Sequence, residues 1–153
     1  MPGTRDYTPF NNSSDSRGSG GGRWARRTIG RVEAHAATIL LVEDQSAVRE
    51  LVRQAFERWG HTVLQASAPA EALALATVNA PRLDLVVTDL TFEQGSGTSL
   101  VENLIERGLD LPVLYFSGWS EPPAFLPGKR TLFLAKPFEL SQLEWAIVQL
   151  LAD

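Results

Sequence analysis

The chain contains no cysteine. This absence excludes a disulfide framework, a thiolate zinc site and a cysteine nucleophile, so any chemistry must use carboxylates, hydroxyls, amines or the two histidines. The sequence also lacks an apolar run of the roughly 20 residues that a membrane-spanning helix needs. Its first 22 residues are polar and rich in glycine, without the apolar core of a secretory signal. We therefore expect a cytoplasmic protein that does not bind membranes.

A large excess of positive charge is missing as well. Lys and Arg total 14 against 18 Asp and Glu, which gives a formal net charge of −4. Because nucleic-acid-binding domains carry strong basic patches, we do not expect the folded part of the chain to bind nucleic acid directly. The charge is uneven: residues 1–37 contain six arginines and three acidic residues, whereas residues 38–153 contain 8 basic and 15 acidic residues.

Residues 1–37 also differ from the rest in composition. They hold six of the 12 glycines and few large apolar side chains, so we predict a disordered tail that cannot offset its ordering entropy. A basic cluster around Trp24 is formed by Arg23, Arg26, Arg27 and Arg31. We interpret this cluster as a solvated linker, and its alternative role is contact with an acidic protein surface, RNA or a membrane. Residues 38–153 then form the single folded domain.

The folded part alternates between two hydrophobic periods. Short apolar runs typical of buried strands occupy 38–42, 61–65, 83–88, 112–116 and 131–135. Amphipathic helical patterns separate most of them, which predicts an α/β fold with a doubly wound five-stranded parallel sheet. A capping box at Ser99 and Glu102 is expected near the start of the third helix, with Gly108 at its end.

The fourth connection is irregular. It contains Pro122, Pro123 and Pro127 between Gly118 and Gly128. Proline interrupts helical hydrogen bonding, so we predict a shortened fourth helix of at most one turn around 121–126.

Polar residues close the predicted strands. Glu43 and Asp44 follow the first strand, Asp89 the third, Ser117 the fourth and Lys136 the fifth. Taken singly, each has an ordinary structural interpretation as a helix cap, a turn residue or a surface lysine. Together they are expected to converge, because the carboxyl ends of parallel strands meet at one edge of the sheet. Three neighbouring carboxylates repel one another unless a cation neutralises them, and oxygen ligands without His or Cys favour Mg²⁺.

The segments ILLVEDQSAVRE, LVVTDL, LYFSGWS and FLAKPF resemble the signature segments of response-regulator receiver domains. The resemblance covers residues 38–153 and implies the flavodoxin-like strand order 2-1-3-4-5. It also implies that Asp89 accepts a phosphoryl group from a histidine kinase or phosphotransfer protein, that Lys136 contacts that group and that Ser117 is the switch hydroxyl. The implied switch aromatic is Phe133, for which core packing is an equal alternative. The implied Mg²⁺ ligands are Glu43, Asp44, Asp89 and the backbone carbonyl of Thr91.

The chain departs from the family pattern in two places. Phe92 and Glu93 replace the usual Met-Pro after the phosphoacceptor, and prolines erode the fourth helix. The SGWSEPP and LAKPF segments are most similar to receivers of hybrid sensor kinases. No output domain follows the predicted domain in this sequence, so we expect the signal to leave through contact with an unspecified output protein, unless the chain is a fragment of a larger protein.

Three interpretations of function remain open. The first is a phosphoacceptor that switches protein–protein interactions and catalyses only its own phosphorylation and dephosphorylation. The second is a phosphorylation-independent adaptor with the same fold. The third is an aspartyl-phosphate phosphatase, although Thr91 stands where that chemistry usually places a second acid. A bulky ring at Trp119 is expected to shield the acyl phosphate from water.

Overall fold

The computed structural model describes residues 36–118 and 122–152, so most of the predicted disordered tail lies outside the described residues. Within the unit that begins at Ala37, the main sheet consists of β1 (Thr38–Val42), β2 (Thr62–Ala66), β3 (Leu85–Asp89), β6 (Val113–Ser117) and β7 (Thr131–Ala135). All neighbouring strands are parallel, in the order β2-β1-β3-β6-β7. The short strands β4 and β5 form a separate sheet, so β6 and β7 are the fourth and fifth strands of the main sheet. The observed order is therefore the predicted 2-1-3-4-5 of a doubly wound sheet.

The first and fifth strands have the predicted bounds, and the other three are shifted by one or two residues toward the C-terminus. The largest shift is at β3, which begins at Leu85. A 3₁₀ turn, η2 (Ala80–Arg82), precedes it, and the Leu83 N–H donates to the Ala80 carbonyl. Pairing with β1 therefore starts only at Leu85, opposite Ile39.

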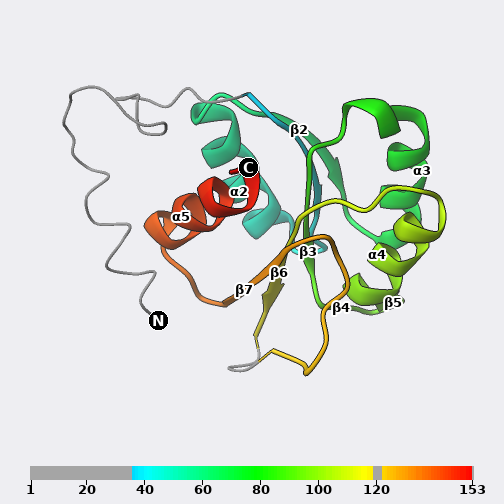
Figure 1. Cartoon of the computed structure of the whole chain (residues 1–153). Helices are drawn as coiled ribbons and strands as arrows, with labels where there is room; N and C mark the ends of the chain where they lie inside the picture. The colour runs from blue at the N-terminus through cyan, green and yellow to red at the C-terminus, as the bar shows by residue number, and fades with distance from the viewer. Residues whose placement is uncertain (1–35, 119–121, 153) are drawn as a thin grey trace. The chain divides into compact units, whose positions relative to one another are not determined.

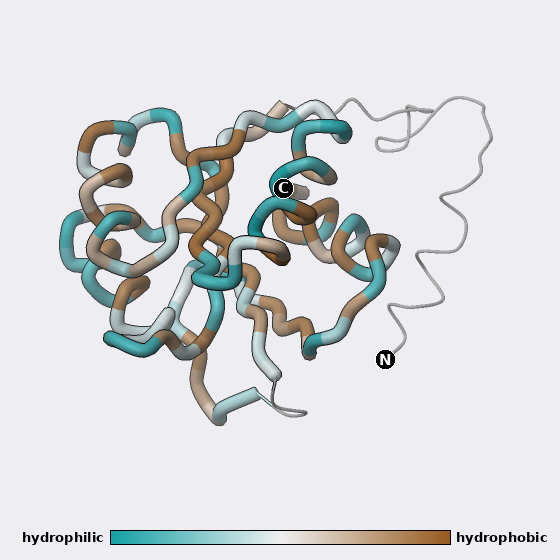
Figure 2. Tube along the Cα trace, turned by 180° about the vertical axis from the view of Figure 1, so that it is seen from behind, coloured by the Kyte–Doolittle hydropathy of each residue, from teal (hydrophilic) through white to brown (hydrophobic). Residues whose placement is uncertain are grey.

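Four helices cover the sheet: α2 (Ser46–Arg58), α3 (Pro69–Asn79), α4 (Gly97–Glu106) and α5 (Leu140–Leu151). Helices α2 and α5 lie on one side of the sheet, and α3 and α4 lie on the other (Figure 1). Hydrophobic residues follow the central strands, whereas hydrophilic residues lie mostly on the outer turns of the helices and loops (Figure 2). Both sheet faces are therefore covered, as the continuously apolar strands predict.

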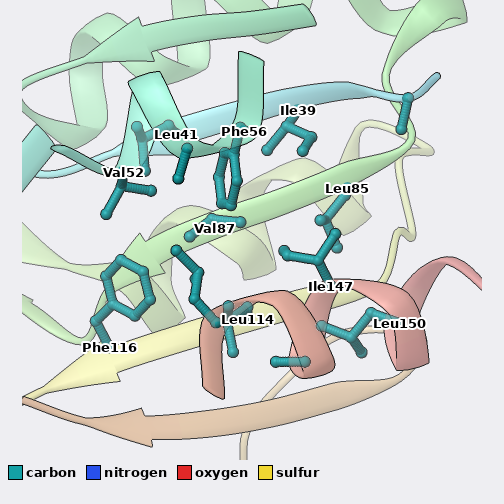
Figure 3. Packing of buried hydrophobic residues seen from close by; sticks show 14 residues of the cluster. Ile39, Leu41, Val52, Phe56, Leu85, Val87, Leu114, Phe116, Ile147 and Leu150 are labelled. Carbon is teal, nitrogen blue, oxygen red and sulfur yellow. The ribbon is translucent and has the colours of Figure 1, made fainter. Parts of the chain in front are cut away.

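Apolar side chains from both sheet and helices form the core on the α2/α5 side. Phe56 of α2 and Ile147 of α5 both point toward this face of the sheet (Figure 3). Val87 lies between them on β3, the central strand. Burial of each such side chain contributes about 1.5–3 kcal/mol, which explains why this packing holds the strand ends in place.

The start of α4 corrects the predicted capping box. Ser96 is the N-cap, and its hydroxyl accepts a hydrogen bond from the Ser99 N–H, so Ser99 lies inside the helix. The connection between β3 and α4 contains an antiparallel hairpin of β4 (Thr91–Phe92) and β5 (Gly95–Ser96), which keeps the chain extended up to the N-cap. A capping box does occur, but in α5, between Glu139 and Gln142. The sequence pattern missed the hairpin because each strand has only two residues.

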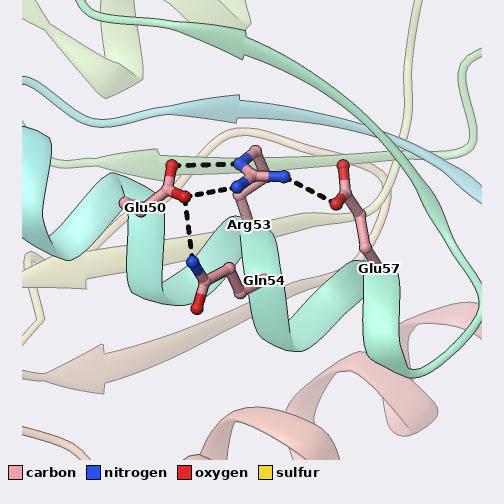
Figure 4. Close-up of polar contacts among 4 residues, drawn as sticks. All are labelled: Glu50, Arg53, Gln54 and Glu57. Carbon is pink, nitrogen blue, oxygen red and sulfur yellow. Dashed lines mark hydrogen bonds and ion pairs between the residues drawn. The ribbon is translucent and has the colours of Figure 1, made fainter.

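The outer face of α2 carries an ion-pair network (Figure 4). Arg53 donates to the carboxylates of Glu50 and Glu57, and Gln54 also donates to Glu50. Hydrogen bonds from Arg53 and then Gln54 lower the pKa of Glu50, and those from Arg53 to both carboxylates raise the pKa of Arg53. Such i, i+3 and i, i+4 pairs support an exposed helix face and weaken with salt.

The crossover from β6 to β7 has no helix among its described residues, 122–130. Its second half is anchored instead: the Tyr115 hydroxyl donates to the Pro127 carbonyl over 2.6 Å, and the Lys129 N–H donates to the Leu111 carbonyl over 3.1 Å. Every residue of β6 is buried, whereas every residue of β7 is only partly buried. The missing helix therefore leaves the last strand less covered than its neighbour.

Candidate functional site

The two acidic residues after β1 have different environments. Glu43 is fully buried and Asp44 is exposed. The Glu43 carboxylate accepts the Gln45 N–H over 3.0 Å, and its backbone carbonyl accepts from the Arg49 guanidinium over 2.7 Å. Arg49 lies in the first turns of α2, so the helix and the acidic pair are joined directly.

Asp89 is the last residue of β3 and is 5% exposed. Its backbone carbonyl accepts the Thr88 hydroxyl over 2.9 Å. The backbone of Gly97 lies against the same carbonyl, so closely that an added Cβ would stand 2.1 Å from the Asp89 oxygen. The Gly97 N–H also donates to the Leu90 carbonyl over 2.8 Å. The absence of a side chain at Gly97 therefore permits the start of α4 to lie beside Asp89.

Lys136 joins the acidic residues. Its Nζ lies 2.9 Å from Asp89 Oδ1 and 3.0 Å from Glu43 Oε1. It reaches them from the end of β7, where its N–H donates to the Ser117 carbonyl over 2.7 Å and a cis peptide bond connects it to Pro137. Residues at the ends of β1, β3 and β7 thus meet in one place, as the sequence predicted from parallel-strand topology.

The acidic cluster has the donor set of a hard-cation site. One carboxylate oxygen from each of Glu43, Asp44 and Asp89 lies within 4.8 Å of the other two. Mg²⁺ prefers carboxylate and carbonyl oxygen ligands, so the chemistry of this donor set fits that ion. Thr91 lies in β4 and is exposed, and its role as a carbonyl ligand stays a prediction.

The pKa of Asp89 is raised to about 7 in the fold. Burial is the largest cause and the neighbouring Glu43 acts in the same direction, while Lys136 lowers the pKa in part. Burial alone would lower the pKa of Lys136, but its contacts with Asp89 and then Glu43 outweigh this and raise it. The ammonium therefore stays charged, and a second cation at the carboxylates would favour the ionised form of Asp89.

In metal-free buffer, we expect the free energy of unfolding to fall as the pH rises from 3.8, the ordinary pKa of Asp89, to about 7, its pKa in the fold. Over this range the folded protein binds more protons than the unfolded chain, so ionisation favours unfolding. Asp89→Asn should lose this part of the pH dependence and, above the higher pKa, be more stable by about 1–3 kcal/mol. Urea unfolding with EDTA at a series of pH values measures both effects.

The exposed Asp110 offers a matched control for this prediction. Asp110→Asn should keep the wild-type pH profile. An Asp89→Asn profile that coincides with the wild-type one would contradict the assigned pKa.

Ser117 and Phe133 are the two residues of the predicted switch. Ser117 is 6% exposed at the end of β6. Phe133 is partly buried, packs on the α3/α4 side and is in register with the fully buried Tyr115. This packing agrees with a core role for Phe133, and the switch roles of both residues stay predictions. Trp119, expected to shield the site, lies outside the described residues.

Two residues that support the site have no role assigned from the sequence. Arg49 belongs to the first signature segment, and its signal is a basic residue about one helical turn beyond the acidic pair. Gly97 is the first residue of α4, and its signal is a glycine at the start of a helix. Neither signal by itself indicates which backbone group the residue approaches.

The fold and the site define a doubly wound α/β domain with an acidic cluster and a paired lysine at the carboxyl ends of its strands. Residues 39–148 match the family model described as the response regulator receiver domain. The chain belongs to this family, the receiver domains of two-component signalling.

Curated relatives agree with this assignment. The chain is 35% identical over 120 residues to the sensor kinase CckA of Brucella abortus (strain 2308), a match that covers 76% of this chain and 13% of that protein. It is 36% identical over 108 residues to the response regulator MprA of Mycobacterium sp. (strain KMS), covering 69% and 46% respectively. The chain thus spans less than half the length of these relatives.

Solved structures show the same fold. The receiver domain of the hybrid histidine kinase CckA is 29% identical with a TM-score of 0.67, and the match covers 76% of this chain and all of that one (100%). A response regulator receiver protein from Sinorhizobium medicae WSM419 is 29% identical with a TM-score of 0.63, covering 76% and 94% respectively. Among the described residues, no helix has the length and apolarity needed to cross a membrane.

Proposed function

We propose that this domain accepts a phosphoryl group on Asp89 from a phosphohistidine of a histidine kinase or phosphotransfer protein. The contact of Lys136 Nζ with both Asp89 and Glu43 inside the acidic cluster carries this proposal. It brings a positive charge within 2.9 Å of the carboxylate oxygen that would receive or adjoin the phosphoryl group. The similarity to the sensor kinase CckA and to the receiver domain of a hybrid histidine kinase supports a phosphohistidine donor.

In the transfer step, a carboxylate oxygen of Asp89 attacks phosphorus in line as the N–P bond of the phosphohistidine breaks. The electron pair of that bond leaves with the imidazole, which then takes a proton from water. The ammonium of Lys136 moves from the free carboxylate to a phosphoryl oxygen and neutralises its charge. The residues that would hold Mg²⁺, which supplies further positive charge against the phosphoryl oxygens, are Glu43, Asp44, Asp89 and Thr91.

The response to phosphorylation is a population shift. The acyl phosphate offers the Ser117 hydroxyl a new acceptor, so the chain after β6 moves toward Asp89 and Phe133 turns inward. Two or three charge-assisted hydrogen bonds supply the few kcal/mol that such a shift needs. The output is a changed contact with another protein, and the location is the cytoplasm.

A small-molecule phosphodonor with Mg²⁺ tests the proposal. Intact mass should show one phosphoryl group per chain, stable in acid and labile in base, and none without Mg²⁺. Asp89→Asn should take up none, whereas Asp110→Asn, a change at an exposed carboxylate, should behave as wild type.

The same assay separates the two other functions. Donor turnover far beyond one equivalent favours an aspartyl-phosphate phosphatase. No phosphoryl uptake, in a protein that still binds its partner, favours the phosphorylation-independent adaptor. Either result would overturn the phosphoacceptor proposal.

A further inference from the structure

The crossover from β6 to β7 leaves part of one sheet face without a helix. On the α3/α4 side, Tyr115 of β6 is fully buried, but its register neighbour Phe133 of β7 is only partly buried. No helix occurs in the described residues 122–130 to cover that strand. On this side of the sheet β7 is therefore less covered by the described residues than β6.

The crossover exposes an aromatic side chain next to residues that are anchored to the domain. Phe125 is 71% exposed, and residues 122–124 before it are exposed as well. Directly after it, Leu126 packs against the core on the α3/α4 side, and Pro127 is buried with its carbonyl bound by Tyr115. A large exposed apolar group next to anchored residues is typical of a binding surface, because little ordering entropy remains to be lost on binding.

The same segment is positively charged in an acidic domain. Lys129 and Arg130 are both exposed, and residues 122–130 contain no acidic residue. By contrast, residues 38–153 as a whole contain 15 acidic and 8 basic residues. A partner for this surface therefore needs apolar side chains opposite Phe125 and carboxylates opposite the two cations.

We propose that the crossover surface, formed by Phe125, Leu126, Lys129 and Arg130, binds an acidic amphipathic helix of a partner protein. The helix lies along the crossover beside β7 and places its apolar stripe on Phe125 and Leu126. Its carboxylates face the two cations. This inference goes beyond the proposed function, because none of these four residues belongs to the acidic cluster and binding does not require phosphorylation.

Two other occupants fit the surface less well. A second copy docked through the same surface would bring two sets of Lys129 and Arg130 together, and like charges oppose that contact. A strand added to the free edge of β7 would use backbone groups of that strand and leave Phe125 exposed.

Titration of the unphosphorylated, full-length ¹⁵N-labelled chain with three designed peptides tests the proposal. The first is an acidic amphipathic helix of Leu and Glu of about 18 residues, roughly five turns. The second has Lys in place of Glu, and the third is the acidic peptide interrupted by two prolines. We expect the acidic helix to shift amide signals of 122–130 and β7, and to bind at least about tenfold more tightly than either other peptide.

Variants of the surface sharpen the test. Phe125→Asp and the double change Lys129→Glu with Arg130→Glu should each weaken binding of the acidic peptide by about tenfold or more. Val78→Asp is the matched control, since Val78 is 76% exposed on α3, and it should leave binding unchanged. Asp89→Asn should also bind normally, so failure of the phosphoacceptor proposal would leave this result intact.

Several results would overturn the inference. Equally tight binding of the lysine peptide would contradict the charge complementarity. Unchanged affinity of the acidic peptide for Phe125→Asp would contradict the apolar contact. Equal binding of the proline-interrupted peptide, with shifts confined to β7, would indicate strand addition. Self-association that Phe125→Asp abolishes, without peptide binding, would indicate a second copy as the occupant.

Discussion

Lys136→Met is expected to lower the free energy of unfolding in metal-free buffer by about 2–4 kcal/mol. The change removes the cation that lies 3.0 Å from Glu43 and 2.9 Å from Asp89. Glu43 is fully buried, so it would remain as a charge with no ammonium beside it. Millimolar Mg²⁺ should restore part of the loss, because a bound divalent cation again neutralises the carboxylates. Urea unfolding with EDTA and with Mg²⁺ measures both effects.

The same variant should take up the phosphoryl group about a hundredfold more slowly, because it lacks the charge that meets the phosphoryl oxygens. The chain provides a matched control in Lys129, its only other lysine, which is exposed. Lys129→Met should change neither stability in EDTA nor the rate of uptake. If both variants lost the same stability and the same rate of uptake, Lys136 would act through the net charge of the protein and not through its two carboxylate contacts.

Gly97→Ala is expected to destabilise the domain by about 2–3 kcal/mol and to slow phosphoryl uptake. The added Cβ would stand 2.1 Å from the Asp89 carbonyl oxygen, so either α4 or the end of β3 must move. The atoms nearest to the added Cβ belong to the Asp89 backbone and not to a flexible side chain, so moving them apart is costly. Because Asp89 carries the reactive carboxylate, a shift of its backbone also changes its position relative to Lys136. Thermal unfolding and the phosphodonor assay measure the two consequences.

Gly118→Ala is the control for the glycine prediction. A Cβ at Gly118 would meet no heavy atom within 4 Å, and its backbone does not lie in the left-handed region. We expect little change in its stability. If Gly97→Ala proved as stable as Gly118→Ala, with normal phosphoryl uptake, the close approach of α4 to Asp89 would not constrain the site.

Much of the site could be predicted from the sequence because its elements are local patterns. Buried parallel strands are short apolar runs, and the residues that close them follow directly in the chain. Asp89 and Lys136 were therefore placed at one edge of the sheet without coordinates. Prolines act on the backbone where they occur, so the loss of a full helix in the fourth connection was predictable. The single turn expected around 121–126 is absent from the described residues 122–126.

Other features depend on residues far apart in the sequence. Glu43 and Asp44 are adjacent and chemically alike, yet the first is buried against Lys136 and the second is exposed. The closeness of Gly97 to Asp89 likewise follows from a hairpin too short to give a hydrophobic pattern.

The sequence by itself determined the succession of strands and helices along the chain and the types of group at the strand ends, because both follow from local hydrophobic periodicity and backbone chemistry. Only the tertiary structure decided which carboxylates Lys136 contacts, which acid is buried, and how closely Gly97 lies to Asp89. These properties depend on distances of a few ångströms between separate elements, such as the 2.9 Å from Lys136 to Asp89. Packing of the helices on the sheet sets such distances, and no local sequence pattern encodes them.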